Sequence, residues 1–171
     1  EYENLQFQST DPDIYRGGVA NIPESEMQGV ELELIGLISE SLSFDLRVAY
    51  LDTEITSSYE ALDNLNAELY FFGEEPIRYS LRENLKGNQL AKSPELTANF
   101  GIEYISETSY GLLTTTAEVI YRGDFQQRVF NNPFVDQVDS YSVVNLTASL
   151  DLIGDNWGVD LMLLNVGDKD G

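Results

Sequence analysis

Apolar and polar residues alternate strictly in several stretches of the chain. In residues 42–50 every second side chain is apolar: Leu42, Phe44, Leu46, Val48 and Tyr50. Residues 95–104 and 143–152 repeat the alternation. Because successive side chains of a β-strand point to opposite faces, this pattern predicts strands with one apolar and one polar face.

Weaker versions of the same pattern occupy residues 1–8, 28–35, 113–122 and 157–164. With the three strong stretches they predict seven strands. Several reach the roughly 9–11 residues that a tilted strand needs to cross a bilayer, whereas strands of soluble proteins usually have about 5–6.

The connections between these strands alternate in length. Short turns are predicted near 37–41, 106–110 and 153–156, and long connections near 10–22, 56–93 and 126–140. Outer-membrane barrels show this alternation, with tight periplasmic turns and long outer loops. Aromatic residues near the strand ends suit the membrane interfaces. These residues are Tyr50, Tyr104, Tyr121, Tyr141 and Trp157.

A soluble β-sandwich also contains alternating strands. It must bury its apolar face against a second sheet, and it rarely combines long strands with regularly alternating loop lengths. The pattern therefore favours an all-β, antiparallel transmembrane β-barrel fragment of about seven meander strands.

The composition narrows the possible functions. Nine basic and 30 acidic residues give a net charge of −21, which repels phosphate backbones and argues against nucleic-acid binding. Cysteine and histidine are absent, so these residues provide no disulfide, no Cys/His zinc site and no Ser–His–Asp triad. We expect no enzymatic activity, no cofactor and no metal site.

The predicted connection over 56–93 leaves two questions open. Ala61, Leu62, Leu65 and Leu69 have helical spacing, so the segment forms either a short helix or an irregular loop packed on its own aromatic residues. Acidic residues of the loops could bind Ca²⁺, but no spaced Asp-x-Asp-x-Asp-Gly loop is present, so a solvated acidic surface is favoured. The acidic residues considered are Asp52, Glu54, Asp63, Glu74 and Glu75.

Four motifs resemble the C-terminal strands of TonB-dependent receptors. Residues 21–33 contain an Asn before Gly29-Val30-Glu31, and residues 85–94 contain a Gly-x-x-Leu-x-x-x-Pro motif. Residues 139–146 resemble the "sYtlvNl" strand, and Asn156-Trp157 with 165–169 resembles "nW…NLfDk". Each motif alone is weak, but four in the right order over nearly the whole chain are specific. Val166-Gly167 departs from the usual Leu-Phe.

The resemblance implies a larger protein. Receptors of this family have an N-terminal plug, a TonB-contact segment (the TonB box) and a barrel of about 22 strands. Residues 1–171 would be the C-terminal portion of that barrel, roughly strands 15 to 21, without the plug and the final strand. In this position Glu31 and Asn145 would face the lumen as wall residues. Residues 3–9 also resemble an engineered protease site, although the strand interpretation is preferred.

The resemblance implies multi-pass insertion in the outer membrane of a Gram-negative bacterium. The expected function is active import of a bulky, scarce nutrient, most often a ferric siderophore. The expected partners are outer-membrane lipid including lipopolysaccharide, the TonB–ExbB–ExbD complex acting through the plug, and the nutrient. Two alternatives remain: a small self-contained barrel acting as an adhesin or anchor, and a soluble sandwich lectin.

Candidate ligand contacts lie in the two longest predicted loops. Aromatic faces with arginine donors can hold a bulky anionic or catecholate ligand by stacking and charge-assisted hydrogen bonds. Cations are rare in this acidic chain, so arginines are the sharper candidates. The predicted ligand-binding residues are Arg78, Tyr79, Arg82, Arg128 and Phe130.

Overall fold

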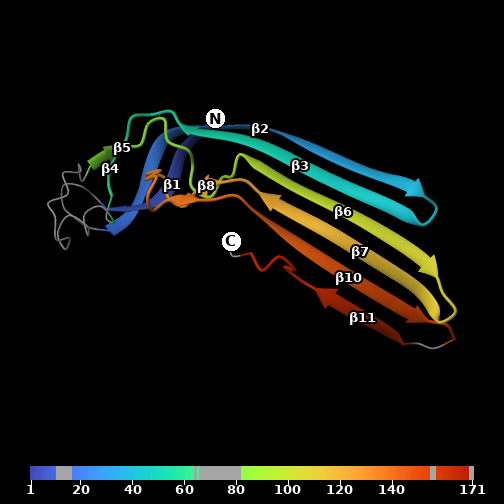
Figure 1. The fold of residues 1–171 in the computed structure, drawn as a ribbon. Helices are drawn as coiled ribbons and strands as arrows, with labels where there is room; N and C mark the ends of the chain where they lie inside the picture. Colours follow the sequence, from blue (N-terminus) through green and yellow to red (C-terminus); the bar gives the residue numbers. More distant parts are fainter. Residues whose placement is uncertain (11–16, 64, 66–81, 155–156, 170–171) are drawn as a thin grey trace. The chain divides into compact units, whose positions relative to one another are not determined.

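The computed structural model describes residues 1–10, 17–63, 65, 82–154 and 157–169, and most of them form β-strands. Seven long strands are present in this part of the chain, and each contains most or all of one predicted strand (Figure 1). They are β1 (Tyr2–Thr10), β2 (Gly17–Ser39), β3 (Leu42–Ile55), β6 (Leu96–Glu107), β7 (Gly111–Arg122), β10 (Tyr141–Leu152) and β11 (Gly158–Leu163). The described connections also contain short strands: β4 (Glu60–Leu62), β5 (Arg82–Asn84), β8 (Phe125–Gln126) and β9 (Gln137–Val138).

The long strands form an antiparallel meander. Their order in the sheet is β11-β10-β7-β6-β3-β2-β1, and β4 and β5 continue the same sheet beyond β1. β8 and β9 form a separate two-stranded sheet. Each long strand is therefore the neighbour of the next one along the chain. This is the all-β meander that the alternation predicted.

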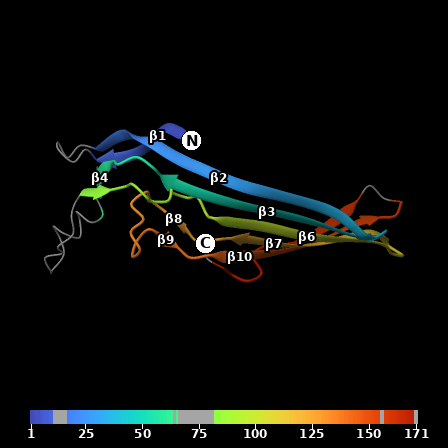
Figure 2. The same cartoon turned by 90° about the horizontal axis from the view of Figure 1, so that it is seen from above.

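The chain divides into two compact units. The loop unit contains residues 1–28, 51–93 and 125–137, and the strand unit contains residues 29–50, 94–124 and 138–171. In the strand unit the strands run alongside one another, as both ribbon views show (Figures 1 and 2).

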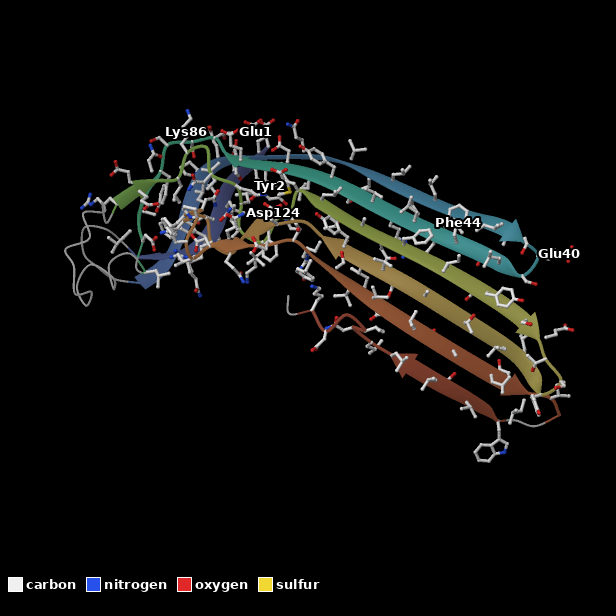
Figure 3. All side chains as sticks on the ribbon, in the orientation of Figure 1. Glu1, Tyr2, Glu40, Phe44, Lys86 and Asp124 are labelled. Atoms are coloured by element: carbon white, nitrogen blue, oxygen red, sulfur yellow. The ribbon has the colours of Figure 1, made fainter. Side chains whose placement is uncertain are left out.

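The pairing register of the strand unit places the apolar residues of each strand opposite those of the next. Leu46 of β3 pairs with Phe100 of β6, and Phe100 pairs with Val119 of β7. Val119 in turn pairs with Val144 of β10. Side chains leave the long strands on both sides (Figure 3). A one-residue shift would mix the two faces, so the alternating pattern fixes the register.

The apolar face of the strand unit stays largely exposed. Phe100 is 41% exposed, Val119 39% and Leu161 59%. So many exposed large apolar side chains exceed what a soluble monomer usually shows, and they suit contact with hydrocarbon. No helix among the described residues is long and apolar enough to cross a membrane.

Two predictions about the connections need correction. Residues 17–22 belong to β2 rather than to a long loop, because they pair with β1 from Thr10↔Gly17 to Leu5↔Ile22. The cross-strand hydrogen bonds extend β2 well past the alternating stretch, and even Pro23 is accommodated within it. Of the four residues at helical spacing, Ala61 and Leu62 form strand β4, since they pair with Glu83 and Arg82 of β5, whereas Leu65 is helical. Leu69 lies outside the described residues.

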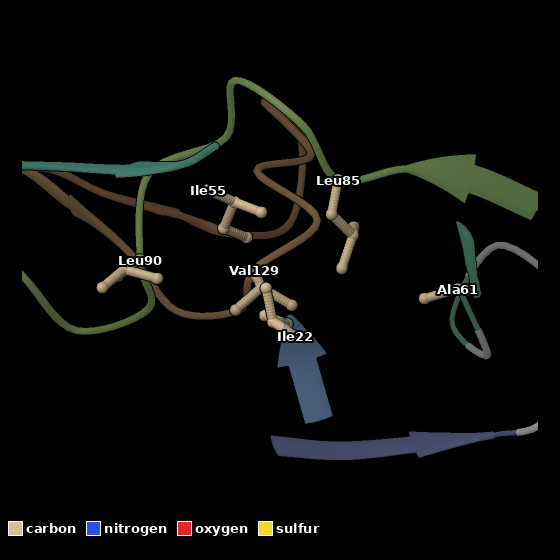
Figure 4. Close-up of a cluster of buried hydrophobic side chains, with 6 residues drawn as sticks. All are labelled: Ile22, Ile55, Ala61, Leu85, Leu90 and Val129. Carbon is tan, nitrogen blue, oxygen red and sulfur yellow. The ribbon is translucent and has the colours of Figure 1, made fainter. Parts of the chain in front are cut away.

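The loop unit has a small hydrophobic core of its own (Figure 4). Its members come from β2, the end of β3, β4, the segment after β5 and the segment after β8. They are Ile22, Ile55, Ala61, Leu85, Leu90 and Val129, each at most 7% exposed. Phe7 and Tyr59 pack against this core and contact each other edge to face. The predicted loops therefore fold on a common core instead of extending into solvent.

Candidate functional site

Backbone and amide hydrogen bonds join two segments of the loop unit, residues 85–93 and 126–137. Asn88 donates from Nδ2 to the carbonyl oxygens of Val129 (2.8 Å) and Phe130 (3.1 Å). Gln89 N–H donates to Asn131 Oδ1 (2.6 Å), and Asn131 Nδ2 donates back to the Gln89 carbonyl (3.0 Å). The positive φ of Asn131 (51°) suits a residue type that tolerates this conformation. Together these bonds satisfy polar groups that a buried loop would otherwise leave unpaired.

Arg128 lies between two fully buried carboxylates, those of Asp63 and Asp136. Its Nη1 and Nη2 donate to the two Asp63 oxygens (2.6 and 3.3 Å). Its Nε and Nη2 donate to the two Asp136 oxygens (2.5 and 3.2 Å). The planar guanidinium thus makes a bidentate contact with each carboxylate, which is the strong form of this interaction.

The electrostatics of this cluster keep Arg128 charged. Burial by itself lowers the pKa of Arg128, but its hydrogen bonds to Asp63 and Asp136, together with the negative charges of these carboxylates, outweigh burial and raise that pKa above its ordinary value. The guanidinium also lies over the Phe130 ring, 5.2 Å from its centroid, in cation–π geometry.

A tight turn after Asn131 exposes an aromatic side chain. Asp136 N–H donates to the Asn132 carbonyl (2.8 Å), and Asn132 N–H donates to Asp136 Oδ2 (2.9 Å). Phe134 N–H donates to Asn132 Oδ1 (3.0 Å). Between these fixed ends Phe134 is 85% exposed, more than any other large apolar side chain in the described part. Sequence reasoning missed Phe134, although the turn-forming Asn-Pro pair before it was the available signal.

The predicted ligand-binding residues have different surroundings. Arg78 and Tyr79 lie outside the described residues. Arg82 begins β5 and is exposed. Arg128 makes the ion pairs above, and Phe130 is partly buried against the core of the loop unit. The role predicted for these five residues in ligand binding stays a prediction.

The acidic residues considered for Ca²⁺ do not gather in the described part of the chain. Asp63 pairs with Arg128, Asp52 accepts a hydrogen bond from Gln28 (3.1 Å) and Glu54 is exposed. Glu74 and Glu75 lie outside the described residues. Among the described residues no group of three or more acidic side chains is placed to hold a metal ion.

The polar face of the strand unit carries a network of side chains across neighbouring strands. Glu118 accepts hydrogen bonds from Asn99 (2.8 Å) and Asn145 (3.0 Å). Arg47 pairs with Glu33 (2.9 Å). A hollow of about 670 Å³ lies over this wall, and Glu33, Arg47, Asn99, Arg122 and Tyr141 contribute to its lining. Asn145, which we expected to line the barrel wall, therefore makes a hydrogen bond to a side chain of the neighbouring strand.

One glycine makes room for a further carboxylate on the polar face. Gly101 lies in register between Asp45 and Glu118. A Cβ at Gly101 would lie 2.5 Å from Asp45 Oδ2, so the carboxylate occupies the space that any larger residue would fill. Asp45 Oδ2 is buried there without a hydrogen-bond partner among the described residues.

Comparison with known proteins agrees with this architecture. A family model described as "TonB dependent receptor-like, beta-barrel" matches residues 1–166. No curated protein matches the chain. The meander of long strands, its exposed apolar face and its polar network are what such a barrel wall requires. The match covers nearly the whole chain, so the chain belongs to the TonB-dependent receptor β-barrel family, whose members are transporters and not enzymes and lie in the Gram-negative outer membrane.

Proposed function

We propose that the TonB-energised outer-membrane transport performed by this family serves, in this protein, to import a ferric siderophore. The observation that carries the proposal is the folded loop unit, which has its own core and exposes Phe134 from a fixed turn. Stacking on an exposed aromatic ring suits the flat rings of a catecholate iron chelator. Arginine donors in the same acidic loops suit its negative charge.

The proposed cargo contacts are Arg78, Arg82 and Phe134. Arg82 is exposed at the start of β5, and Phe134 has almost its whole side chain available. Only nine basic residues are present against 30 acidic ones, so an exposed arginine such as Arg82 changes the local charge appreciably. Phe130 is a weaker candidate, because it packs against the core and against Arg128.

The proposed partners follow from the two faces of the strand unit. Outer-membrane lipid, including lipopolysaccharide, would contact the exposed apolar face. The TonB–ExbB–ExbD complex would act through a plug domain, as in the family. The family match supports a transporter over a self-contained adhesin or anchor.

Uptake of radioactive iron by cells expressing the full-length receptor tests the cargo. Ferric triscatecholate and ferric trishydroxamate complexes are supplied separately, with and without TonB. We expect TonB-dependent uptake of the triscatecholate, because its rings and negative charge match Phe134 and the arginines. Absence of TonB-dependent uptake of both complexes would refute the siderophore assignment.

Variants of the same receptor test the contacts. Phe134→Ala should weaken binding of the triscatecholate up to roughly tenfold, and Phe134→Trp should retain it, since one aromatic stack contributes about 0.5–1.5 kcal/mol. Arg78→Gln with Arg82→Gln should weaken binding further. Lys86→Gln is the matched control, because it removes an exposed positive charge from the same unit. Equal affinity in all variants would remove these residues from the binding site.

A further inference from the structure

The Asp63–Arg128–Asp136 cluster connects parts of the loop unit that are far apart in sequence. Asp63 follows β4 directly, and Arg128 lies 65 residues further on. Asp136 lies at the other end of the turn that Arg128 precedes. A single guanidinium therefore fixes the β4 end of one long connection to both sides of the 126–137 segment.

Charge and burial make this connection hard to open. Both carboxylates are fully buried, whereas the Arg128 side chain is 31% exposed. Two buried negative charges share one positive charge, so displacing Arg128 would leave two uncompensated carboxylates away from water. Removing one partner of such a cluster is strongly destabilising, even where the intact cluster adds little net stability.

Contacts that do not involve the Arg128 side chain join a third stretch, residues 85–93, to the same 126–137 segment. Asn88, Gln89 and Asn131 close the 85–93 segment onto the 126–137 segment by hydrogen bonds. Leu85, Leu90 and Val129 pack in one core beneath them.

We propose that Asp63, Arg128 and Asp136 form a clasp that holds the end of β4 against the 126–137 segment in the receptor before cargo arrives. Arg128 is then a positioning residue and not a cargo contact. The turn that exposes Phe134 is preformed, since its Asp136 anchor is held by Arg128. Cargo meets an ordered surface and does not bear the entropic cost of ordering these segments. The clasp does not depend on the proposed function, whereas binding of cargo to this surface rests on it.

Hydrogen exchange of the full-length receptor, measured without cargo, tests the clasp. Amides of residues 60–63 and 126–137 should be protected in the wild type, because opening the clasp exposes buried charge. Arg128→Gln should accelerate their exchange roughly tenfold or more while strand-unit amides keep their rates. Lys86→Gln, which removes an exposed charge from the same unit, should leave the rates of both segments unchanged.

A neutral triple variant separates electrostatic clasping from simple packing. Asp63→Asn, Arg128→Gln and Asp136→Asn together remove the uncompensated charges, so protection should recover partly relative to Arg128→Gln alone. If Arg128→Gln does not assemble, Arg128→Lys serves in its place, because lysine keeps the charge but lacks the bidentate fork.

Two results would overturn the clasp. The first is that the two segments exchange without protection in the cargo-free wild type. The second is that Arg128→Gln, or Arg128→Lys in its place, exchanges at the same rates as Lys86→Gln. The assay contains no cargo, so a wrong siderophore assignment cannot produce either result. Conversely, if the clasp hypothesis fails, the uptake experiment still tests which cargo the receptor imports.

Discussion

Individual side chains show which face of each strand meets which environment. Leu46 of β3 lies in a row of apolar residues with Phe100 and Val119, whereas Asp45 and Arg47 beside it belong to the polar face. The cost of introducing a charged side chain should therefore depend on which face of the strand the residue occupies, which alternates from one position to the next.

We predict that Leu46→Arg destabilises the folded barrel by about 2–4 kcal/mol, because it places a charge on the lipid-facing side near the midplane. Arg47→Glu changes charge at the adjacent position of the polar face and should cost far less. Reversible urea unfolding of the full-length receptor in phospholipid vesicles measures both. Similar losses at the two positions would contradict the assignment of faces.

At the scale of elements, β3 and β6 pair closely because Gly101 leaves space for the Asp45 carboxylate. We predict that Gly101→Ala costs about 1–3 kcal/mol, since the added methyl group overlaps Asp45 Oδ2. The double variant Asp45→Ala with Gly101→Ala should recover most of that loss. A double-mutant cycle by urea unfolding measures the coupling, and purely additive effects would show that the two residues do not compete for space.

Some strand boundaries cannot be predicted from the local pattern of apolar and polar residues. Alternation correctly predicted the seven long strands, because the period of two is a property of the strand itself. It missed residues 17–22 of β2 and the strand β4, whose formation depends on pairing with β1 and β5. Pairing across the sheet overrides weak local preferences, so such segments cannot be assigned from their own residues.

For the whole molecule, alternating loop lengths predict which ends of the strands lie outside the cell. The sequence contains no cysteine, so single cysteines can be introduced as labels. We predict that a membrane-impermeant maleimide modifies Phe134→Cys on intact cells and spares Glu40→Cys, which lies in the turn between β2 and β3 (Figure 3). Permeabilised cells should label both. The reverse pattern on intact cells would invert the topology.

The candidate site was predictable only in part. The arginines were singled out because cations are rare in a chain of net charge −21, and Arg128 does hold a distinctive position. Its partners could not be foreseen, since Asp63 lies 65 residues away within a stretch without periodicity. Phe134 was overlooked because the exposure of a loop residue depends on how the surrounding segments pack.

Side-chain alternation and short motifs are local properties of the chain, so they were sufficient to predict the strands, their two faces and the resemblance to the family. Three features became visible only in the fold: the predicted loops share a core, Arg128 bridges two buried carboxylates, and Phe134 is exposed. The physical reason is that a strand's pattern repeats along one segment. The partners of a loop residue come from segments that only folding brings together.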